Sequence, residues 1–193
     1  KNVFKLKPGQ LISIDSNFNK EELTYLSPKD IDHSNKRENN ENLINKLNIL
    51  MNNSVEKMSQ SDAPLGSFLS GGTDSSLIAA ILQSQNTSKI DTFTLCNDDP
   101  RYNESEYAIA IANQIKSNHN VIKLKKDDYV SFFEKSHNVF CEPFSDSSQI
   151  PTYYISKFTS KKVRVVLSGD GADELFCGYN RYVYFKNAKS LSK

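Results

Sequence analysis

From residue 61 onward, short apolar runs alternate with segments in which apolar residues recur at helical spacing. The runs predict strands near 64–69, 90–95, 119–124 and 163–168. The periodic segments predict helices near 75–85, 104–116, 127–139, 148–160 and 173–186. Strands that alternate with helices require crossovers between parallel strands. The pattern therefore predicts an α/β fold, a parallel twisted sheet with helices on both faces.

The first 60 residues follow a different pattern. Residues 1–27 hold a turn at Leu6–Gln10 between two short β-like runs, Val3–Phe4 and Leu11–Ile14. Residues 28–60 begin with a polar stretch typical of a linker and continue as an amphipathic helix. We expect its apolar stripe to lie in the core: Leu43, Leu47, Leu50, Met51, Val55 and Met58. The sequence thus predicts three parts, residues 1–27, 28–60 and 61–193.

The first predicted strand of the α/β part runs directly into Ser-Gly-Gly-Thr-Asp-Ser-Ser at residues 70–76, where a helical pattern begins. Two glycines let the backbone approach an anion closely, and the amides of a helix N-terminus attract phosphate oxygens. The carboxylate of Asp74 is unexpected beside phosphate unless Mg²⁺ lies between them. A Gly-Gly turn with only a structural role is the alternative. The segment resembles the pyrophosphate loop (PP-loop) of the N-type ATP pyrophosphatases.

A second motif follows the strand predicted at 163–168. It reads Ser-Gly-Asp-Gly-Ala-Asp-Glu-Leu-Phe-Cys-Gly-Tyr at residues 168–179 and places Asp170, Asp173 and Glu174 within five residues. Carboxylates this close repel one another unless a metal, a cation or a proton offsets their charge. A solvated acidic first turn of a helix is the alternative. The motif resembles the signature of the asparagine synthetases, except that Cys177 replaces a glycine.

The region between the two motifs resembles the same family. A strand at Thr92–Leu95 precedes an acidic segment at 98–104, Asn118–His119 opens the next strand, and residues 142–152 resemble a segment near the amino-acid substrate. The resemblance covers most of residues 60–186 and implies an adenine nucleotide α-hydrolase-like, Rossmann-like fold. It also implies a C–N ligase that uses ATP and Mg²⁺ to adenylate aspartate, releases pyrophosphate, and then amidates the adenylate with ammonia from glutamine.

The resemblance also assigns roles to individual residues. Asp170 and Glu174 are expected to be catalytic, and Asp74 and Asp173 are expected to bind magnesium. The ATP and pyrophosphate site is expected to comprise Phe68, Ser70, Gly71, Gly72, Asp74, Ser75, Ser76, Leu95, Ser168 and Gly169.

Other implications concern the length of the chain. It begins at Lys1 without an N-terminal Cys nucleophile and ends soon after Tyr179–Tyr182, so we expect a fragment. Residues 1–27 are then the end of a missing glutaminase domain, and residues 61–193 are a synthetase domain that is incomplete at its C-terminus. We expect poor turnover by the isolated chain. Apolar surface around Phe176, Tyr182 and Phe185 predicts self-association as a homodimer.

Composition narrows the classes of partner. The 193 residues carry a net charge of +1 without a basic stripe, which argues against nucleic acid or a membrane surface. No apolar run is long enough to span a membrane. The odd and widely spaced cysteines, Cys96, Cys141 and Cys177, are typical of reduced cytoplasmic thiols packed as small hydrophobes. No histidine shows a metal-ligand spacing.

Two alternative functions remain open from the sequence. The chain could be a nucleotide-binding module without turnover. It could also belong with relatives that adenylate another carboxylate, such as the β-lactam synthetases or the amidotransferases of surface-polysaccharide pathways. Pyrophosphate release with aspartate would distinguish a synthetase from a binding module, and trials of other carboxylates would separate the enzymes.

Overall fold

The computed structural model describes residues 3–27, 30, 39–97, 103–140, 142 and 145–191. The chain divides into two compact units, Lys1–Ile44 and Asn45–Lys193. The first unit holds the antiparallel strands β1 (Gln10–Ile14) and β2 (Lys20–Thr24), with Leu11 opposite Leu23. Gly9, with φ +69°, makes the turn before β1. The β-like run predicted at Val3–Phe4 is not a strand, so this prediction is wrong; the turn at Pro8–Gly9 leads into a hairpin that starts later.

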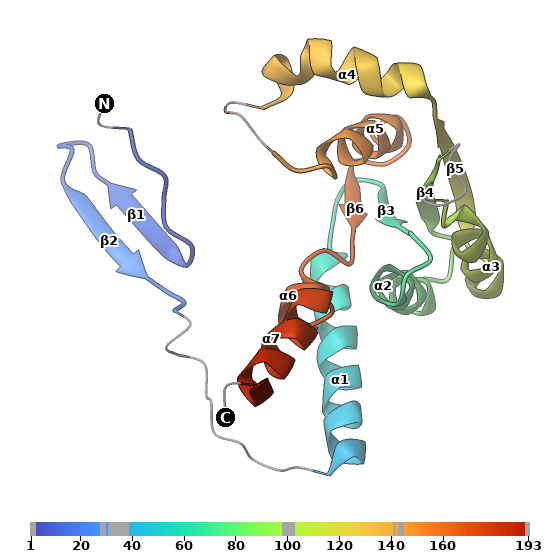
Figure 1. Ribbon diagram of the computed structural model, residues 1–193, viewed down its shortest axis with the longest axis horizontal. Coiled ribbons are helices and arrows are strands. Elements are labelled where there is room, and N and C mark those ends of the chain that lie inside the picture. The colour runs from blue at the N-terminus through green and yellow to red at the C-terminus, as the bar shows by residue number, and fades with distance from the viewer. Residues whose placement is uncertain are drawn as a thin grey trace. The chain divides into compact units, whose positions relative to one another are not determined.

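The second unit is built on a four-stranded parallel sheet (Figure 1). Its strands are β3 (Leu65–Phe68), β4 (Asp91–Asn97), β5 (Asn118–Leu124) and β6 (Val165–Leu167). Their order in the sheet is β5-β4-β3-β6, and each neighbouring pair is parallel. The predicted fold class is therefore confirmed, and each predicted strand lies within a few residues of its observed position.

Helices cover both faces of this sheet. On one face, α1 (Asn40–Met58), α2 (Thr73–Ser84) and α3 (Ser105–Ile115) supply the apolar residues of two buried clusters, centred on Leu82 and Ala108. On the other face, α5 (Gln149–Thr159) packs against Phe93 of β4 and Ile122 of β5. The remaining long crossover helix, α4 (Lys126–Val139), contacts α5 edge to face through Phe132 and Tyr153, whose ring centroids lie 5.3 Å apart.

The predicted helix at 173–186 is wrong as a single element. The structure has a five-residue helix, α6 (Ala172–Phe176), and a separate helix, α7 (Asn180–Leu191). Cys177 between them has φ +58° and ψ +40°, the left-handed conformation that ends helices. Gly178 follows it, and its amide donates to the carbonyl of Asp173 at 3.0 Å. The break follows from this backbone conformation, which the apolar spacing of the segment does not encode.

Two expectations about buried residues also need correction. On α1, Val55 is buried and Met51 packs against the core, but Leu43, Leu47, Leu50 and Met58 are exposed. Of the predicted stripe, only Met51 and Val55 pack into the core among the described residues. Cys177 is exposed and not packed as a small hydrophobe, whereas Cys96 is half-buried. Cys141 lies outside the described residues.

Within the described part of the chain, no helix combines the length and the apolar character that a membrane span requires.

Candidate functional site

The Ser70–Ser76 segment forms a compact hydroxyl-linked turn between β3 and α2. Leu69 prolongs the strand, since its amide donates to the carbonyl of Phe93 at 2.8 Å. Ser70 and Ser75 then join across the turn: the Ser70 amide donates to Ser75 Oγ at 3.1 Å, and the two Oγ atoms lie 2.8 Å apart. Ser76 Oγ donates to the Gly72 carbonyl at 2.6 Å. The serines therefore fix the backbone that leads into the first turn of α2.

Glycine is required at Gly71 in this segment. Its φ is +90°, and an added Cβ would lie 2.7 Å from Tyr107 Cβ and 2.8 Å from the Ala108 nitrogen. The turn therefore passes close to the start of α3. The amides of the first turn of α2 have no partner inside the helix, and they lie at its positive end. The local geometry suits an anion.

The second motif lies directly against the first. β3 and β6 pair in parallel with Ser67 opposite Leu167, so the two segments leave the sheet at the same level. An added Cβ on Gly169 would lie 2.8 Å from the Ser75 nitrogen and 3.1 Å from Asp74 Cβ. Ser168 Oγ donates to Asp170 Oδ2 at 3.1 Å, which orients this carboxylate. Residues nearly one hundred positions apart thus form one site.

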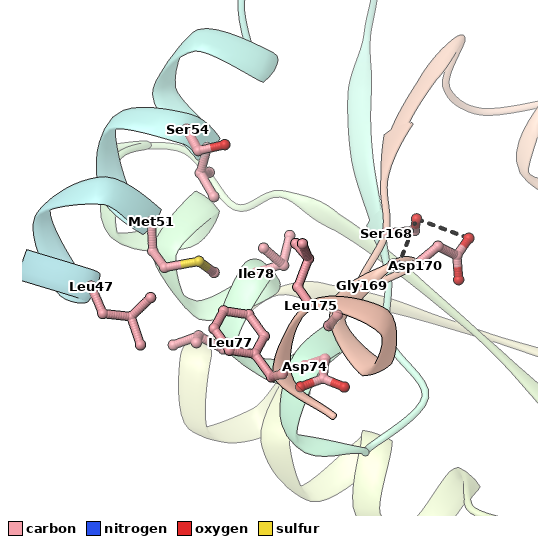
Figure 2. A pocket seen from close by; sticks show the side chains of 14 residues that line it. Leu47, Met51, Ser54, Asp74, Leu77, Ile78, Ser168, Gly169, Asp170 and Leu175 are labelled. Atoms are coloured by element: carbon pink, nitrogen blue, oxygen red, sulfur yellow. Dashed lines mark hydrogen bonds between the residues drawn. The ribbon is translucent and has the colours of Figure 1, made fainter. Parts of the chain in front are cut away.

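Two pockets adjoin this contact, and Asp170 lines both. The first, of about 380 Å³, lies between α1, α2 and α6. Figure 2 shows its apolar side chains directed toward one another, with Asp74 beside them and the hydrogen-bonded Ser168 and Asp170 on the strand side. The apolar wall comprises Leu47, Met51, Val55, Leu77, Ile78, Leu175 and Phe176.

The second pocket, of about 290 Å³, lies at the carboxyl ends of β3 and β4 beside the N-terminal half of α5. It brings together Phe68, Ser70, Leu95 and Asp170 of the predicted site. In a parallel sheet the crevice at the carboxyl ends of the strands is where ligands bind. Asp74, Ser168 and Gly169 of the predicted nucleotide site line the first pocket instead. The other predicted residues of this site line neither pocket: Gly71, Gly72, Ser75 and Ser76.

Asp173 and Glu174 lie apart from both pockets among the described residues. Glu174 Oε1 accepts a hydrogen bond from the Tyr179 hydroxyl at 2.7 Å. That bond lowers the pKa of the Glu174 carboxyl and raises the pKa of the Tyr179 hydroxyl. Asp173 packs against Gly178, where an added Cβ would lie 1.9 Å from its Oδ1. The structure thus brings Asp170 to the pockets, whereas Asp173 and Glu174 lie in α6 and contact the turn at Gly178–Tyr179.

The donors present suit Mg²⁺ held jointly with phosphates better than a preformed metal cage. Among the described residues, no three His, Cys, Asp or Glu side chains converge into a possible metal site. Mg²⁺ commonly takes one or two carboxylates and completes its shell with water and substrate phosphate oxygens. Asp74 lies in the first turn of α2, where a phosphate would bind, and so fits this mode.

Sequence reasoning missed several residues of the site. The apolar wall from α1 was assigned to the core, although Met51 and Val55 also line the first pocket. In the second pocket, Glu104 and Ile155 were not assigned. Pro151 and Thr152 line it too, and both belong to the segment expected near the amino-acid substrate. The position of Glu104 after the carboxyl end of β4 could have indicated that it lies near the site. Residues 98–102 of the same acidic segment lie outside the described residues.

The fold resembles two solved synthetases. The NMN synthetase of Francisella tularensis aligns with a TM-score of 0.51 and 17% identity, covering 70% of this chain and 58% of that one. The NH₃-dependent NAD synthetase of Campylobacter jejuni aligns with a TM-score of 0.50 and 15% identity, covering 70% of this chain and 60% of that one. At this identity the likeness shows the fold alone, an adenine nucleotide α-hydrolase-like fold.

Sequence relatives are more specific. A Methanocaldococcus jannaschii protein is 33% identical over 180 residues, which are 93% of this chain and 34% of that protein. Asparagine synthetase [glutamine-hydrolyzing] 1 of Bacillus subtilis is 34% identical over 140 residues, 72% of this chain and 22% of that protein. The human asparagine synthetase [glutamine-hydrolyzing] is 32% identical over 79% of this chain and 28% of that protein. The chain thus spans about a third or less of these relatives.

A family model described as asparagine synthase matches residues 46–192, which include both motifs, both pockets and the whole parallel sheet. On this match and on the relatives above, the chain belongs to the asparagine synthase family, a family of ligases.

Proposed function

We propose that this chain provides the ATP-dependent part of a glutamine-dependent asparagine synthetase. It would adenylate the side-chain carboxylate of aspartate and present the adenylate to ammonia derived from glutamine. The observation that carries the proposal is the contact between the two family motifs: Gly169 lies against the first turn of α2, which brings Asp170 beside the Ser70–Ser76 segment.

The binding chemistry follows from this contact. The Ser70–Ser76 segment would hold the pyrophosphate portion of ATP through backbone amides and the hydroxyls of Ser70, Ser75 and Ser76. Gly71 and Gly72 leave room for that approach. Phe68, Leu95, Ser168 and Gly169 would contact the nucleoside. The pocket at the strand ends, with Thr152 on its far wall, would hold the reacting carboxylate near Asp170.

The reaction balances without any further reactant. A carboxylate oxygen of aspartate forms a bond to the α-phosphorus of ATP, and the bond from that phosphorus to the bridging oxygen breaks, releasing pyrophosphate. Ammonia then bonds to the acyl carbon, AMP leaves with the oxygen that came from aspartate, and one proton is lost. Asp170 would hold that proton or orient ammonia. Asp74 and Asp173 would bind Mg²⁺, which supplies charge neutralisation for the phosphates when bound.

Oxygen labelling tests this assignment. The protein is incubated with Mg-ATP, ammonia and aspartate labelled with ¹⁸O in its side-chain carboxylate. The AMP that forms is analysed by mass spectrometry. We expect one labelled oxygen in AMP, together with pyrophosphate formed only when aspartate is present. ADP together with ¹⁸O-labelled phosphate would refute adenylation, because aspartate would then have attacked the γ-phosphorus of ATP. Label transfer from another carboxylate but not from aspartate would assign the chain to a relative with a different acceptor.

The cellular setting forms part of the same proposal. Asparagine synthesis draws on ATP, aspartate and glutamine, so we place the protein in the cytoplasm. Of the residues expected to form an apolar surface, Phe176 and Phe185 are exposed and Tyr182 is half-buried, and we propose that this surface supports self-association as a homodimer. Size-exclusion chromatography with light scattering would measure its oligomeric state.

A further inference from the structure

The short helix α6 depends on the turn that follows it. Helices of five residues are not stable by themselves, so contacts outside the helix must hold this one in place. Two such contacts come from the turn Cys177–Tyr179. The Gly178 amide donates to the carbonyl of Asp173 at 3.0 Å, and the Tyr179 hydroxyl donates to Glu174 Oε1 at 2.7 Å.

The Tyr179 ring is itself held from α7. The guanidinium carbon of Arg181 lies 4.1 Å from the centroid of the Tyr179 ring, a cation–π contact. The ring of Tyr182 lies 6.0 Å away, centroid to centroid. Both contacts restrict the ring, and so the hydroxyl keeps its direction toward Glu174. The Tyr179 ring therefore connects Arg181 of α7 to the Glu174 side chain of α6.

The same turn limits Asp173. Gly178 approaches so closely that an added Cβ would lie 1.9 Å from Asp173 Oδ1 and 2.9 Å from its carboxyl carbon. Any displacement of the turn therefore changes the space available to this carboxylate. Neither Asp173 nor Glu174 lines a pocket that adjoins the Ser70–Ser76 segment. The two differ in their partners, because the Glu174 carboxylate accepts the hydrogen bond of the Tyr179 hydroxyl.

We propose that Glu174 is a positioning residue and not a catalytic one: bonded to Tyr179, it fixes the turn Cys177–Tyr179 against Asp173 and so orients the Asp173 carboxylate. This inference rests on the proposed function in one respect, that Asp173 serves magnesium-bound ATP. It replaces the expectation that Glu174 acts on the substrate. The role requires a hydrogen-bond acceptor at residue 174 and does not require a negative charge there.

Four single variants of the 193-residue chain, together with the combined Tyr179→Phe/Glu174→Ala variant, separate these roles. Tyr179→Phe removes only the donating hydroxyl, and Glu174→Ala removes the acceptor. Glu174→Gln keeps an acceptor oxygen and loses the charge. Tyr184→Phe on α7 is the matched control, because Tyr184 is also an exposed tyrosine. Mg-ATP affinity is measured by calorimetry, and hydrogen exchange of the 172–179 amides is measured without nucleotide.

We expect Tyr179→Phe and Glu174→Ala each to weaken Mg-ATP binding by about fivefold and to speed amide exchange, since each removes the same hydrogen bond. The combined variant should be no weaker than either single one. Glu174→Gln should bind within about twofold of the wild type, and Tyr184→Phe should have no effect.

An equal loss in Glu174→Gln and Glu174→Ala would overturn the proposal, because the charge itself would then contact the ligand. Unchanged binding and exchange in Tyr179→Phe would overturn it as well. If the wild type does not bind Mg-ATP, the proposed function fails. The exchange measurement still decides whether the Glu174–Tyr179 bond holds the turn, and unchanged exchange in both variants would reject it.

Discussion

Substitution of Gly169 by alanine tests whether the two motifs form one site. The new Cβ would lie 2.8 Å from the Ser75 nitrogen, 3.1 Å from the Asp74 carbonyl carbon and 3.1 Å from Asp74 Cβ. Two of these three are backbone atoms in the first turn of α2, so no rotamer change relieves the contact, and the two segments must separate. Overpacking of this kind costs about 1–3 kcal/mol. For a chain of this size that cost lowers Tm by about 2–4 °C per kcal/mol.

The same separation should affect the ligand more than the fold. Displacement of the Asp74–Ser75 turn moves the amides that we propose for phosphate, and a loss of about 1.4 kcal/mol there is a tenfold loss of affinity. We therefore expect Gly169→Ala to weaken Mg-ATP binding at least about tenfold by calorimetry.

Gly66→Ala is the matched control for this test. Gly66 lies in β3, outside both motifs, and an added Cβ there would lie 2.8 Å from the Asp91 carbonyl oxygen and 2.9 Å from Phe93 Cε2. Its substitution therefore overpacks the sheet at a cost of about 1–3 kcal/mol, and it should lower Tm but leave affinity nearly unchanged. Equal affinities in Gly169→Ala and Gly66→Ala would refute the reasoning, as would wild-type behaviour of Gly169→Ala in both measurements.

Three other predictions address single residues. Asp74→Asn should weaken binding of Mg-ATP but not of ATP in EDTA, compared by calorimetry, because it removes a metal ligand; equal losses in both would contradict this. Cys177→Gly should raise stability by about 0.5–1 kcal/mol in thermal denaturation, because Cys177 has φ +58°; a lower Tm would show that the side chain contributes more than the strain costs. Burial lowers the pKa of His119 below its ordinary value of 6.5, so the unfolded chain binds more protons than the folded chain near this pH. The free energy of unfolding, measured with urea, should therefore fall as pH drops from about 7.5 to 5.5. His119→Asn should reduce that slope, and an unchanged slope would exclude His119 as its origin.

Much of the fold could be predicted because its signals are local. Apolar runs located β3, β4, β5 and β6, and parallel pairing follows from the helical crossovers between them. Each motif begins where a strand ends, and the carboxyl ends of parallel strands lie at one edge of a sheet. The contact of Gly169 with Asp74 and Ser75 is therefore consistent with the sequence pattern alone.

The remaining features depend on tertiary contacts or on single dihedral angles. The spacing of Leu175, Phe176 and Tyr182 is compatible with one helix, and only the left-handed Cys177 divides it. Likewise, Leu50 and Val55 are equivalent apolar positions in the sequence pattern of α1, yet Val55 is buried and Leu50 is not. Whether a helical stripe is covered depends on the lengths and directions of its neighbours, which periodicity does not encode.

Side-chain roles within the acidic motif were the hardest to predict, and the reason is geometric. Asp170 precedes α6 and accepts a hydrogen bond from Ser168, whereas Glu174 lies in the middle of α6 and accepts one from Tyr179, five residues later. Spacing alone groups these carboxylates, since they lie within five residues of one another. Their backbone conformations separate them, because Gly171 at φ +89° reverses the chain before α6 begins. One glycine thus divides the acidic cluster between a pocket and a turn, and of its three carboxylates only Asp170 lines the described pockets beside the Ser70–Ser76 segment.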